Sequence, residues 1–244
     1  MAVDQPGATL RGFTSELKFV VDTAVGQQIR EWARERLAAD PHGAGTWSDE
    51  YRVSSVYFDT DARDVFHRRG SYGRSKYRIR RYEDDRTVYL ERKLRTGALL
   101  AKRRTSIDLG TLPLINGSSL NGDATAWFRR RVALRALRPV CQVSYARVAR
   151  MSDTPSGPAR LTLDEAIAAF ASNAFTFEER PGIALLDGYA ILELKYRGTI
   201  PAVFKEAVET FALSPRRWSK YRAAAAALRL VESVPEGAPL ASHA

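Results

Sequence analysis

Apolar and polar residues alternate along nine segments of the chain, and a period of two is typical of half-buried β-strands. The predicted strands cover residues 13–21, 52–59, 76–83, 87–94, 99–107, 141–151, 159–164, 174–178 and 184–196. Turn-forming sequences such as EDDR at 83–86 and SDTPSGP at 152–158 separate neighbouring strands. The simplest arrangement of these strands is an antiparallel meander.

Four other segments have the apolar spacing of amphipathic helices, and they cover residues 22–39, 123–137, 201–213 and 215–230. Each begins with Asp, Ile-Pro or Ser-Pro, which are helix-start signals. Residues 13–231 are therefore predicted to form a single α+β domain. The segments 1–12 and 232–244 are rich in residues that pack poorly, and we expect both to be flexible.

Composition narrows the class of partner. The chain has 38 Lys and Arg against 28 Asp and Glu, a net charge of +10, which favours an anionic ligand. Cys141 is the only cysteine, so no intrachain disulfide can form, and we expect it in the core of a cytoplasmic protein. No window reaches the roughly 18 to 20 apolar residues of a membrane span. His42, His67 and His243 are too scattered for a metal site and are expected at the surface.

Basic residues recur on single strand faces, where charges of both signs would be usual. In KYRIRRY, Arg78 and Arg80 share a face because successive side chains alternate. In LLAKRRTSI, either Lys102 and Arg104 or Arg103 alone shares that face, depending on register. The other co-facial pairs are Glu16 with Lys18, Glu91 with Lys93, Tyr145 with Arg147, and Glu193 with Lys195.

Each pair alone is typical of a solvent-exposed strand face, but their repetition favours a common cavity. Basic groups gathered in such a cavity repel one another unless an anion is bound. Arginine and lysine suit phosphate oxygens, and carboxylates among them could hold Mg²⁺ or Mn²⁺. Nucleic acid is a weaker alternative, since no exposed aromatic ladder or nucleic-acid-binding motif is present.

Nine motifs follow in order over residues 13–225: FTSELKFVV, YRVSSVYFDT, KYRIRRY, VYLERK, AKRR, VSYARVA, RLTLD, AILELKYRG and RRWSKY. Together they resemble the catalytic domain of the vacuolar transporter chaperone (VTC) family. That domain is the polyphosphate polymerase branch of the triphosphate tunnel metalloenzyme superfamily. The resemblance implies an α+β fold in which an antiparallel β-barrel forms a tunnel, with helices packed outside it and at its ends.

The resemblance also implies roles for individual residues. The residues expected to act on the phosphates are Lys18, Arg78, Arg80, Lys93, Lys102, Arg147 and Lys220. Further substrate contacts are expected from Arg69, Arg104 and Lys195. Glu193 of LELKY would bind the metal, with Glu16 as a second ligand. The superfamily's ExExK-like motif has a first carboxylate where Thr14 stands here, which weighs against a two-metal mechanism.

The reaction implied is transfer of the γ-phosphoryl group of ATP to a growing polyphosphate chain, with Mn²⁺ or Mg²⁺ as cofactor. A triphosphatase and a non-catalytic polyphosphate sensor are the alternatives. The expected partners are ATP and polyphosphate without specific nucleic acid, and a separate membrane or regulatory partner stays open. No side chain is expected as a covalent nucleophile, and Ser54 and Ser55 are assigned structural roles. Asp59 and Asp164 end predicted strands, where capping a turn is favoured over orienting an arginine.

Overall fold

The computed structural model describes residues 14–41, 43, 49–83, 85–96, 99–116 and 124–231. The segments 1–12 and 232–244, together with His42 and His243, lie outside the described residues. The expectations stated for them stay predictions.

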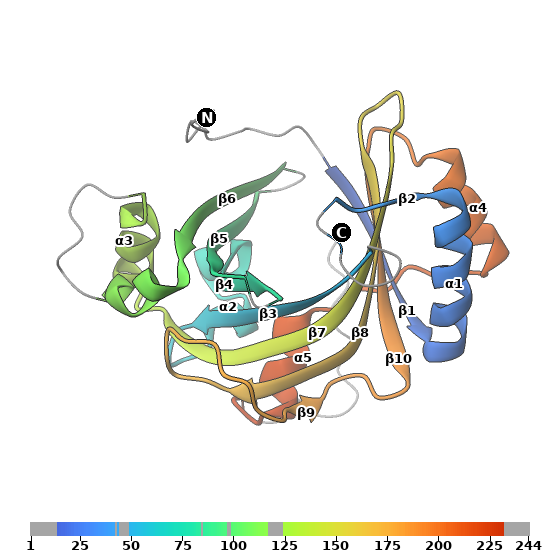
Figure 1. The fold of residues 1–244 in the computed structure, drawn as a ribbon. Coiled ribbons are helices and arrows are strands. Elements are labelled where there is room, and N and C mark those ends of the chain that lie inside the picture. Colours follow the sequence, from blue (N-terminus) through green and yellow to red (C-terminus); the bar gives the residue numbers. More distant parts are fainter. Residues whose placement is uncertain are drawn as a thin grey trace.

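One strongly curled antiparallel sheet dominates the molecule (Figure 1). Its hydrogen-bonded order is β1-β10-β8-β7-β3-β4-β5-β6, with the short β2 on β7 and β9 on β8. The strands are β1 (Thr14–Asp22), β2 (Ala38–Ala39), β3 (Glu50–Asp59), β4 (Ser75–Tyr82), β5 (Thr87–Thr96), β6 (Leu99–Asp108), β7 (Arg138–Ser152), β8 (Ala159–Ala171), β9 (Ile183–Ala184) and β10 (Tyr189–Arg197). The expected α+β architecture built on an antiparallel tunnel sheet is confirmed.

The two ends of the sheet approach each other through side chains. Within the described residues, no backbone pairing joins β6 or β5 to β1. Instead, the Lys93 ammonium on β5 lies 3.2 Å from the Glu16 carboxylate on β1. The curled sheet thus encloses a tunnel whose wall is bridged at this point by an ion pair.

Helices lie outside the sheet and at one end of the tunnel. They are α1 (Thr23–Arg36), α2 (Asp64–His67), α3 (Ala126–Leu134), α4 (Ala202–Thr210) and α5 (Lys220–Ala227), with 3-10 turns η1 (Gly70–Arg74) and η2 (Leu109–Asn116). Asp22 caps α1 by accepting a hydrogen bond from the Val25 amide, and Ser219 caps α5 by accepting one from Arg222. None of the helices among the described residues is long and apolar enough to cross a membrane.

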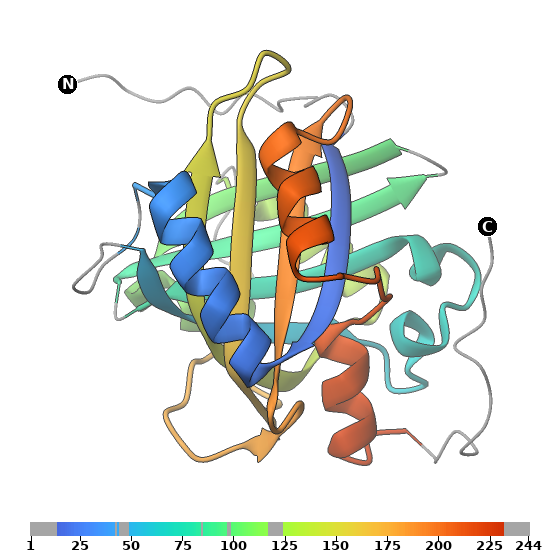
Figure 2. The same ribbon diagram turned by 90° about the vertical axis from the view of Figure 1, so that its right-hand side faces the viewer.

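Two apolar cores hold the helices against the sheet. Helices α1 and α4 cover β1, β10 and β8, where Phe19, Leu192 and Phe204 are fully buried (Figure 2). The other core packs Phe58 against Phe128 of α3 and also includes Tyr221 of α5. Because side chains alternate along each strand, burying these apolar residues outside directs the charged residues between them into the tunnel.

Several predicted elements differ from the structure in type or extent. Residues 174–178 form no strand, because the Gln142 side chain makes two hydrogen bonds with the Glu178 backbone that replace sheet pairing. The predicted strand 184–196 is divided into β9 and β10 by a turn at Gly188, whose φ is +74°. The last helix begins at Lys220 and not at Pro215, because Ser219 provides the cap.

Candidate active site

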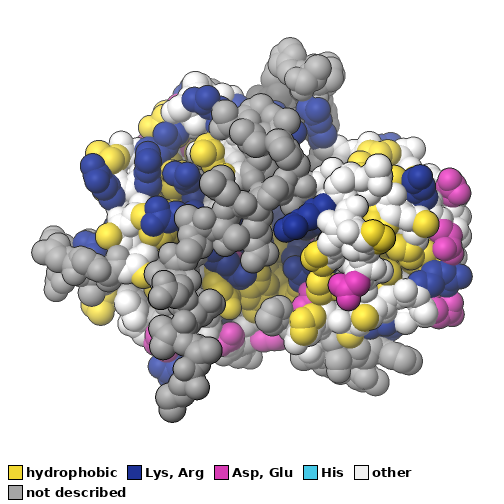
Figure 3. Space-filling model, turned by 90° about the horizontal axis from the view of Figure 1, so that it is seen from above, with side chains coloured by type: hydrophobic (Ala, Val, Ile, Leu, Met, Phe, Trp, Pro, Cys, Tyr) yellow, Lys and Arg dark blue, Asp and Glu magenta, His cyan; other side chains and the backbone are white. Residues whose placement is uncertain are grey.

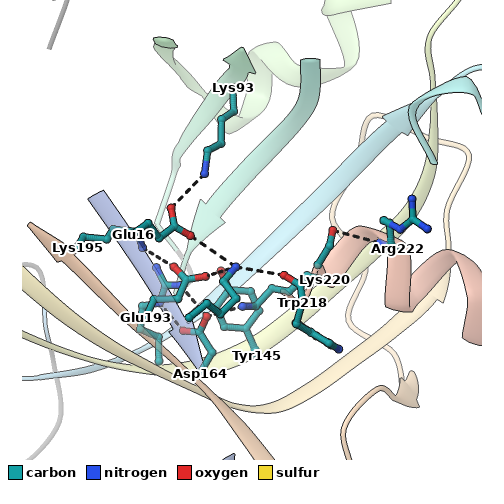
Figure 4. Close-up of polar contacts among 12 residues, drawn as sticks. Glu16, Lys93, Tyr145, Asp164, Glu193, Lys195, Trp218, Lys220 and Arg222 are labelled. Atoms are coloured by element: carbon teal, nitrogen blue, oxygen red, sulfur yellow. Dashed lines mark hydrogen bonds and ion pairs between the residues drawn. The ribbon is translucent and has the colours of Figure 1, made fainter. Parts of the chain in front are cut away.

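Strands β1 and β10 bring the predicted metal ligands together. Their antiparallel register sets Lys18 opposite Glu193 and Glu16 opposite Lys195. The Lys18 ammonium lies 2.9 Å from Glu193 and 3.6 Å from Glu16, and Lys195 donates a hydrogen bond to Glu193. Figure 4 shows Glu16, Glu193 and Lys195 of this cluster close together. The four residues therefore form one network on the tunnel surface.

The charges of this network set the protonation of its acids. Burial raises the pKa of Glu193, but Lys195 and Lys18 outweigh it and hold that pKa well below its usual value. Burial and Glu193 raise the pKa of Glu16, and Lys195 with Lys93 and Lys18 brings it below its usual value. Both carboxylates are thus ionised at neutral pH and carry the charge that a divalent cation needs.

Asp164 on β8 anchors two further cations of the site. Arg147 donates two hydrogen bonds to it, at 2.6 and 2.8 Å, and Lys220 of α5 donates a third. The cationic groups of Arg147 and Lys220 also lie over the Tyr145 ring, 5.2 and 4.5 Å from its centroid. Burial raises the pKa of Asp164, yet Arg147 and Lys220 hold it at about 2.

The capping role expected for Asp164 is therefore wrong. Strand β8 continues past it to Ala171, so the carboxylate is inside a strand and orients a tunnel arginine. The same expectation is confirmed for Asp59, which accepts hydrogen bonds from the Thr60, Val65 and Phe66 amides at the start of α2.

The facing wall of the tunnel is built on β4, β5 and β6. Glu91 is almost fully buried and receives three cations: Arg78 at 2.6 Å, Lys102 at 2.7 Å and Arg104 at 3.2 Å. The register that places Lys102 and Arg104 on the tunnel face is thereby settled, and Arg103 points to the other side of β6. Arg80 has no described ion pair and instead donates to the Ser55 and Tyr145 hydroxyls, each at 3.0 Å.

We name the two sides by their charges. The mixed wall comprises Glu16, Lys18, Arg147, Asp164, Glu193, Lys195 and Lys220, three carboxylates and four cations. The basic wall comprises Lys76, Arg78, Arg80, Glu91, Lys93, Lys102 and Arg104, one carboxylate and six cations. Viewed from above, Lys and Arg gather beside and within the hollow of the molecule (Figure 3).

Two lysines of the basic wall have lowered pKa values. Burial, Lys18 and Lys93 lower the pKa of Lys76 to about 7. Burial also lowers the pKa of Lys102, to about 8, although Glu91 opposes it. The Lys76 ammonium donates to the Ser219 hydroxyl at 3.1 Å, and no described carboxylate pairs with it. An anion in the tunnel would relieve this repulsion.

The loop before α5 lies against the tunnel lining. Lys18 donates a hydrogen bond to the Trp218 carbonyl oxygen at 3.3 Å, and Trp218 directly precedes Ser219, which caps α5. Because Lys220 follows directly, the helix start places one more cation beside Asp164. This arrangement brings the late RRWSKY motif to the same site as strands from the beginning of the chain.

Nine of the ten predicted phosphate-binding residues lie on the two walls, and Arg69 does not. Arg69 is exposed in the loop after α2, where it pairs with Asp64 at 3.2 Å and donates to the Ala62 carbonyl oxygen. His67 is exposed, as predicted. Cys141 is fully buried, and burial raises the pKa of its thiol to about 12, in agreement with a core role.

The sequence-based list omitted four residues that the structure places in the site, namely Lys76, Glu91, Tyr145 and Asp164. Three of them carried a usable signal. Lys76 is two residues from Arg78, Glu91 two from Lys93, and Tyr145 two from Arg147, so each shares a face with a predicted site residue. Asp164 had no such partner within its motif.

The residues present fit a hard divalent cation that keeps much of its hydration. Glu16 and Glu193 both contact Lys18, so their carboxylates border one space. No group of three or more His, Cys, Asp or Glu suited to a metal occurs among the described residues. Mg²⁺ or Mn²⁺ bound by one or two carboxylates together with waters and substrate phosphates matches this limited donor set.

Comparisons with solved structures give the fold. A candidate adenylate cyclase from Bacillus halodurans aligns with a TM-score of 0.53 and 16% identity, over 85% of this chain and 95% of that chain. A candidate adenylyl cyclase from Hippeastrum, described as having a dominant triphosphatase activity, aligns with a TM-score of 0.51 and 15% identity, over 90% and 97%. At such identities the likeness concerns the fold alone.

Sequence comparison gives the family. A search of curated proteins finds no match. The family model of the VTC domain matches residues 13–229, a range that includes both walls and the loop before α5. The chain therefore belongs to the VTC domain family.

Proposed function

We propose that this protein is a polyphosphate polymerase that transfers the γ-phosphoryl group of ATP to the end of a polyphosphate chain. The observation that carries the proposal is the basic wall, whose six cations have one carboxylate between them. Such an excess of positive charge along three strands suits a long linear anion better than a single small phosphate. Ionised carboxylates on the mixed wall suit the divalent cation that accompanies a nucleoside triphosphate.

In the proposed reaction a terminal oxygen of the polyphosphate attacks the γ-phosphorus of ATP. A new P–O bond forms, the bond from the γ-phosphorus to the β,γ-bridging oxygen breaks, and ADP leaves with that electron pair. Arg78, Arg80 and Lys102 neutralise charge on the non-bridging oxygens, and the tunnel keeps the two phosphates in line. No side chain needs to act as a nucleophile.

A divalent metal, when bound, would neutralise charge on the phosphates as the leaving ADP forms. Glu193 and Glu16 would hold it, while Lys18 and Lys195 orient the Glu193 carboxylate. Asp164 fixes the Arg147 guanidinium with two hydrogen bonds, so that its remaining donors can reach a phosphate. Comparing the activity with Mn²⁺ and with Mg²⁺ identifies the preferred ion.

Hydrolysis is a second candidate, in which water replaces the polyphosphate end as acceptor. It is supported by the fold shared with the Hippeastrum protein and by the same set of phosphate ligands. The ratio of cations to carboxylates favours the polymerase. Hydrolysis needs a base or an oriented water, and the mixed-wall carboxylates are already paired with cations.

The test is incubation of the purified protein with ATP and Mn²⁺ or Mg²⁺, with and without a short polyphosphate primer. Products are separated on a gel, while ADP and free phosphate are quantified. We expect long chains, with one ADP for each phosphate added, and loss of activity in Glu193→Gln. Glu206→Gln is the matched control, because Glu206 lies on α4 and pairs with Arg36 outside the tunnel.

Other product patterns would contradict the polymerase. Free phosphate equal to ADP, without chains, would identify a triphosphatase. Tight binding of polyphosphate without turnover in either metal would identify a sensor. Full activity of Glu193→Gln would show that Glu193 is not the metal ligand, even if polyphosphate chains form.

A further inference from the structure

A second basic pocket lies outside the tunnel. It has a volume of about 360 Å³ and is lined by Arg103, Trp127, Arg130, Arg131 and Leu134. Four of these residues come from α3, which packs on the outer face of the sheet, and Arg103 comes from β6 (Figure 1). The volume is within the range of about 300 to 1,000 Å³ typical of small-molecule sites. We call it the α3 pocket.

The α3 pocket is separate from the tunnel because of strand geometry. Lys102 and Arg104 of β6 both reach Glu91 inside the tunnel. Arg103 lies between them in the sequence, so its side chain leaves the opposite face of the strand and meets α3. A ligand in the α3 pocket and a phosphate in the tunnel would thus bind to opposite faces of one strand.

The cations of the α3 pocket have no described counter-charge. No ion pair is described for Arg103, Arg130 or Arg131, and all three are exposed. The chain has no Asp or Glu anywhere from residue 124 to residue 152, which includes the whole of α3. Guanidinium groups kept together without carboxylates favour an anion, and their planar forks match phosphate oxygens.

The pocket also has an ordered apolar side. The Trp127 indole nitrogen donates to the Thr105 hydroxyl at 2.8 Å, and its ring packs edge-on against Phe128. The Arg103 guanidinium lies 4.6 Å from the Trp127 ring centroid, which holds this cation in place. Leu134 is 70% exposed and adds a large apolar side chain to the border of the pocket.

We propose that the α3 pocket binds a nucleoside di- or triphosphate. Its phosphates would contact Arg130, Arg131 and Arg103, and its base would pack against the apolar border formed by Leu134 and the Arg103–Trp127 pair. Inorganic polyphosphate would use the three cations but would leave the apolar border without a partner. The proposal assigns a nucleotide site independent of the tunnel and of the reaction proposed for it.

The test measures ADP binding by equilibrium dialysis and calorimetry, without metal and without turnover. Wild-type protein should bind ADP at two classes of site. The double variant Arg130→Ala/Arg131→Ala should lose one class, with affinity there falling about tenfold or more for each cation removed. Arg80→Ala should weaken only the tunnel class. Arg52→Ala is the matched control, because Arg52 lies near the start of β3, is exposed and has no described ion pair.

Leu134→Ala separates a nucleotide site from a general phosphate site. It should weaken ADP binding at the α3 pocket several-fold and leave inorganic tripolyphosphate binding unchanged. Arg103→Ala provides a second way to remove the site if the double variant melts below wild type. Unchanged ADP stoichiometry in both arginine variants would overturn the proposal, as would equal effects of Leu134→Ala on ADP and tripolyphosphate. A missing polymerase activity would not overturn this proposal, because ADP binding is measured directly.

Discussion

Lys18 on the mixed wall and Lys76 on the basic wall of the tunnel have pKa values that are shifted in opposite directions. On the mixed wall, burial lowers the pKa of Lys18, but Glu193 and Glu16 more than reverse this and raise it. On the basic wall, burial and neighbouring lysines bring the pKa of Lys76 down to about 7. Each carboxylate of the mixed wall is thus paired with cations of the same wall. On the basic wall the cations outnumber the one carboxylate, and a bound anion would relieve their repulsion.

The largest effect should come from breaking the mixed wall at Asp164. In Asp164→Asn, Arg147 and Lys220 keep their buried charges but lose the carboxylate that compensates them. Removing one partner of a buried ion pair costs about 3 to 5 kcal/mol of unfolding free energy. Urea denaturation measures this, with Asp108→Asn, an exposed partner of Arg86, as control. A loss as small as the control's would show that solvent already screens the pair.

A cation of the basic wall should matter for activity far more than for stability. Arg80→Ala removes a buried guanidinium that has no described ion pair and donates to the Ser55 and Tyr145 hydroxyls. We expect the rate of ADP release from ATP to fall about 10²- to 10³-fold, the loss typical of one charge-stabilising donor. The melting temperature should change little. Activity within threefold of wild type would mean that the phosphates do not contact this part of the wall.

Ligand binding should also move protons on the basic wall. At pH 8 the Lys76 amine, with its pKa at about 7, is mostly neutral, and a bound phosphate chain would raise that pKa. Binding of tripolyphosphate should therefore be accompanied by uptake of about one proton from solvent by Lys76, and Lys102, with its pKa at about 8, adds a smaller part. Calorimetry in two buffers of different ionisation enthalpy measures the uptake. The same uptake in Lys76→Met would exclude Lys76 as its main source.

The smallest effect is expected outside both walls. Arg69 was predicted to bind substrate, but it pairs with Asp64 in its own exposed loop. Arg69→Ala should change activity and tripolyphosphate affinity less than twofold, because exposed ion pairs contribute little. A tenfold loss of affinity would restore its predicted role and would require this loop to move toward the tunnel.

Alternation along the strands predicted most of the strands and which residues share a face, whereas the tunnel and the roles of the site residues were implied by the family resemblance. Arg78, Arg80, Glu193 and Lys195 were placed on inward faces because the side chains between them are apolar. What the sequence could not supply was pairing over long distances in the chain. The Asp164–Lys220 contact joins residues 56 positions apart, and the Gln142–Glu178 bonds replaced a predicted strand. Contacts of this kind depend on the tertiary arrangement and leave no local pattern.

The ion pair between Lys93 and Glu16 has a consequence for how long a product could stay bound. A tunnel sealed by backbone hydrogen bonds releases a polymer only through its ends, whereas an electrostatic seam can open sideways. Salt screens exposed charges over about 10 Å at 0.1 M ionic strength, and the Lys93 side chain is 48% exposed. For the proposed polymerase, the number of phosphates added in one encounter would then fall as ionic strength rises, so this ion pair would limit processivity.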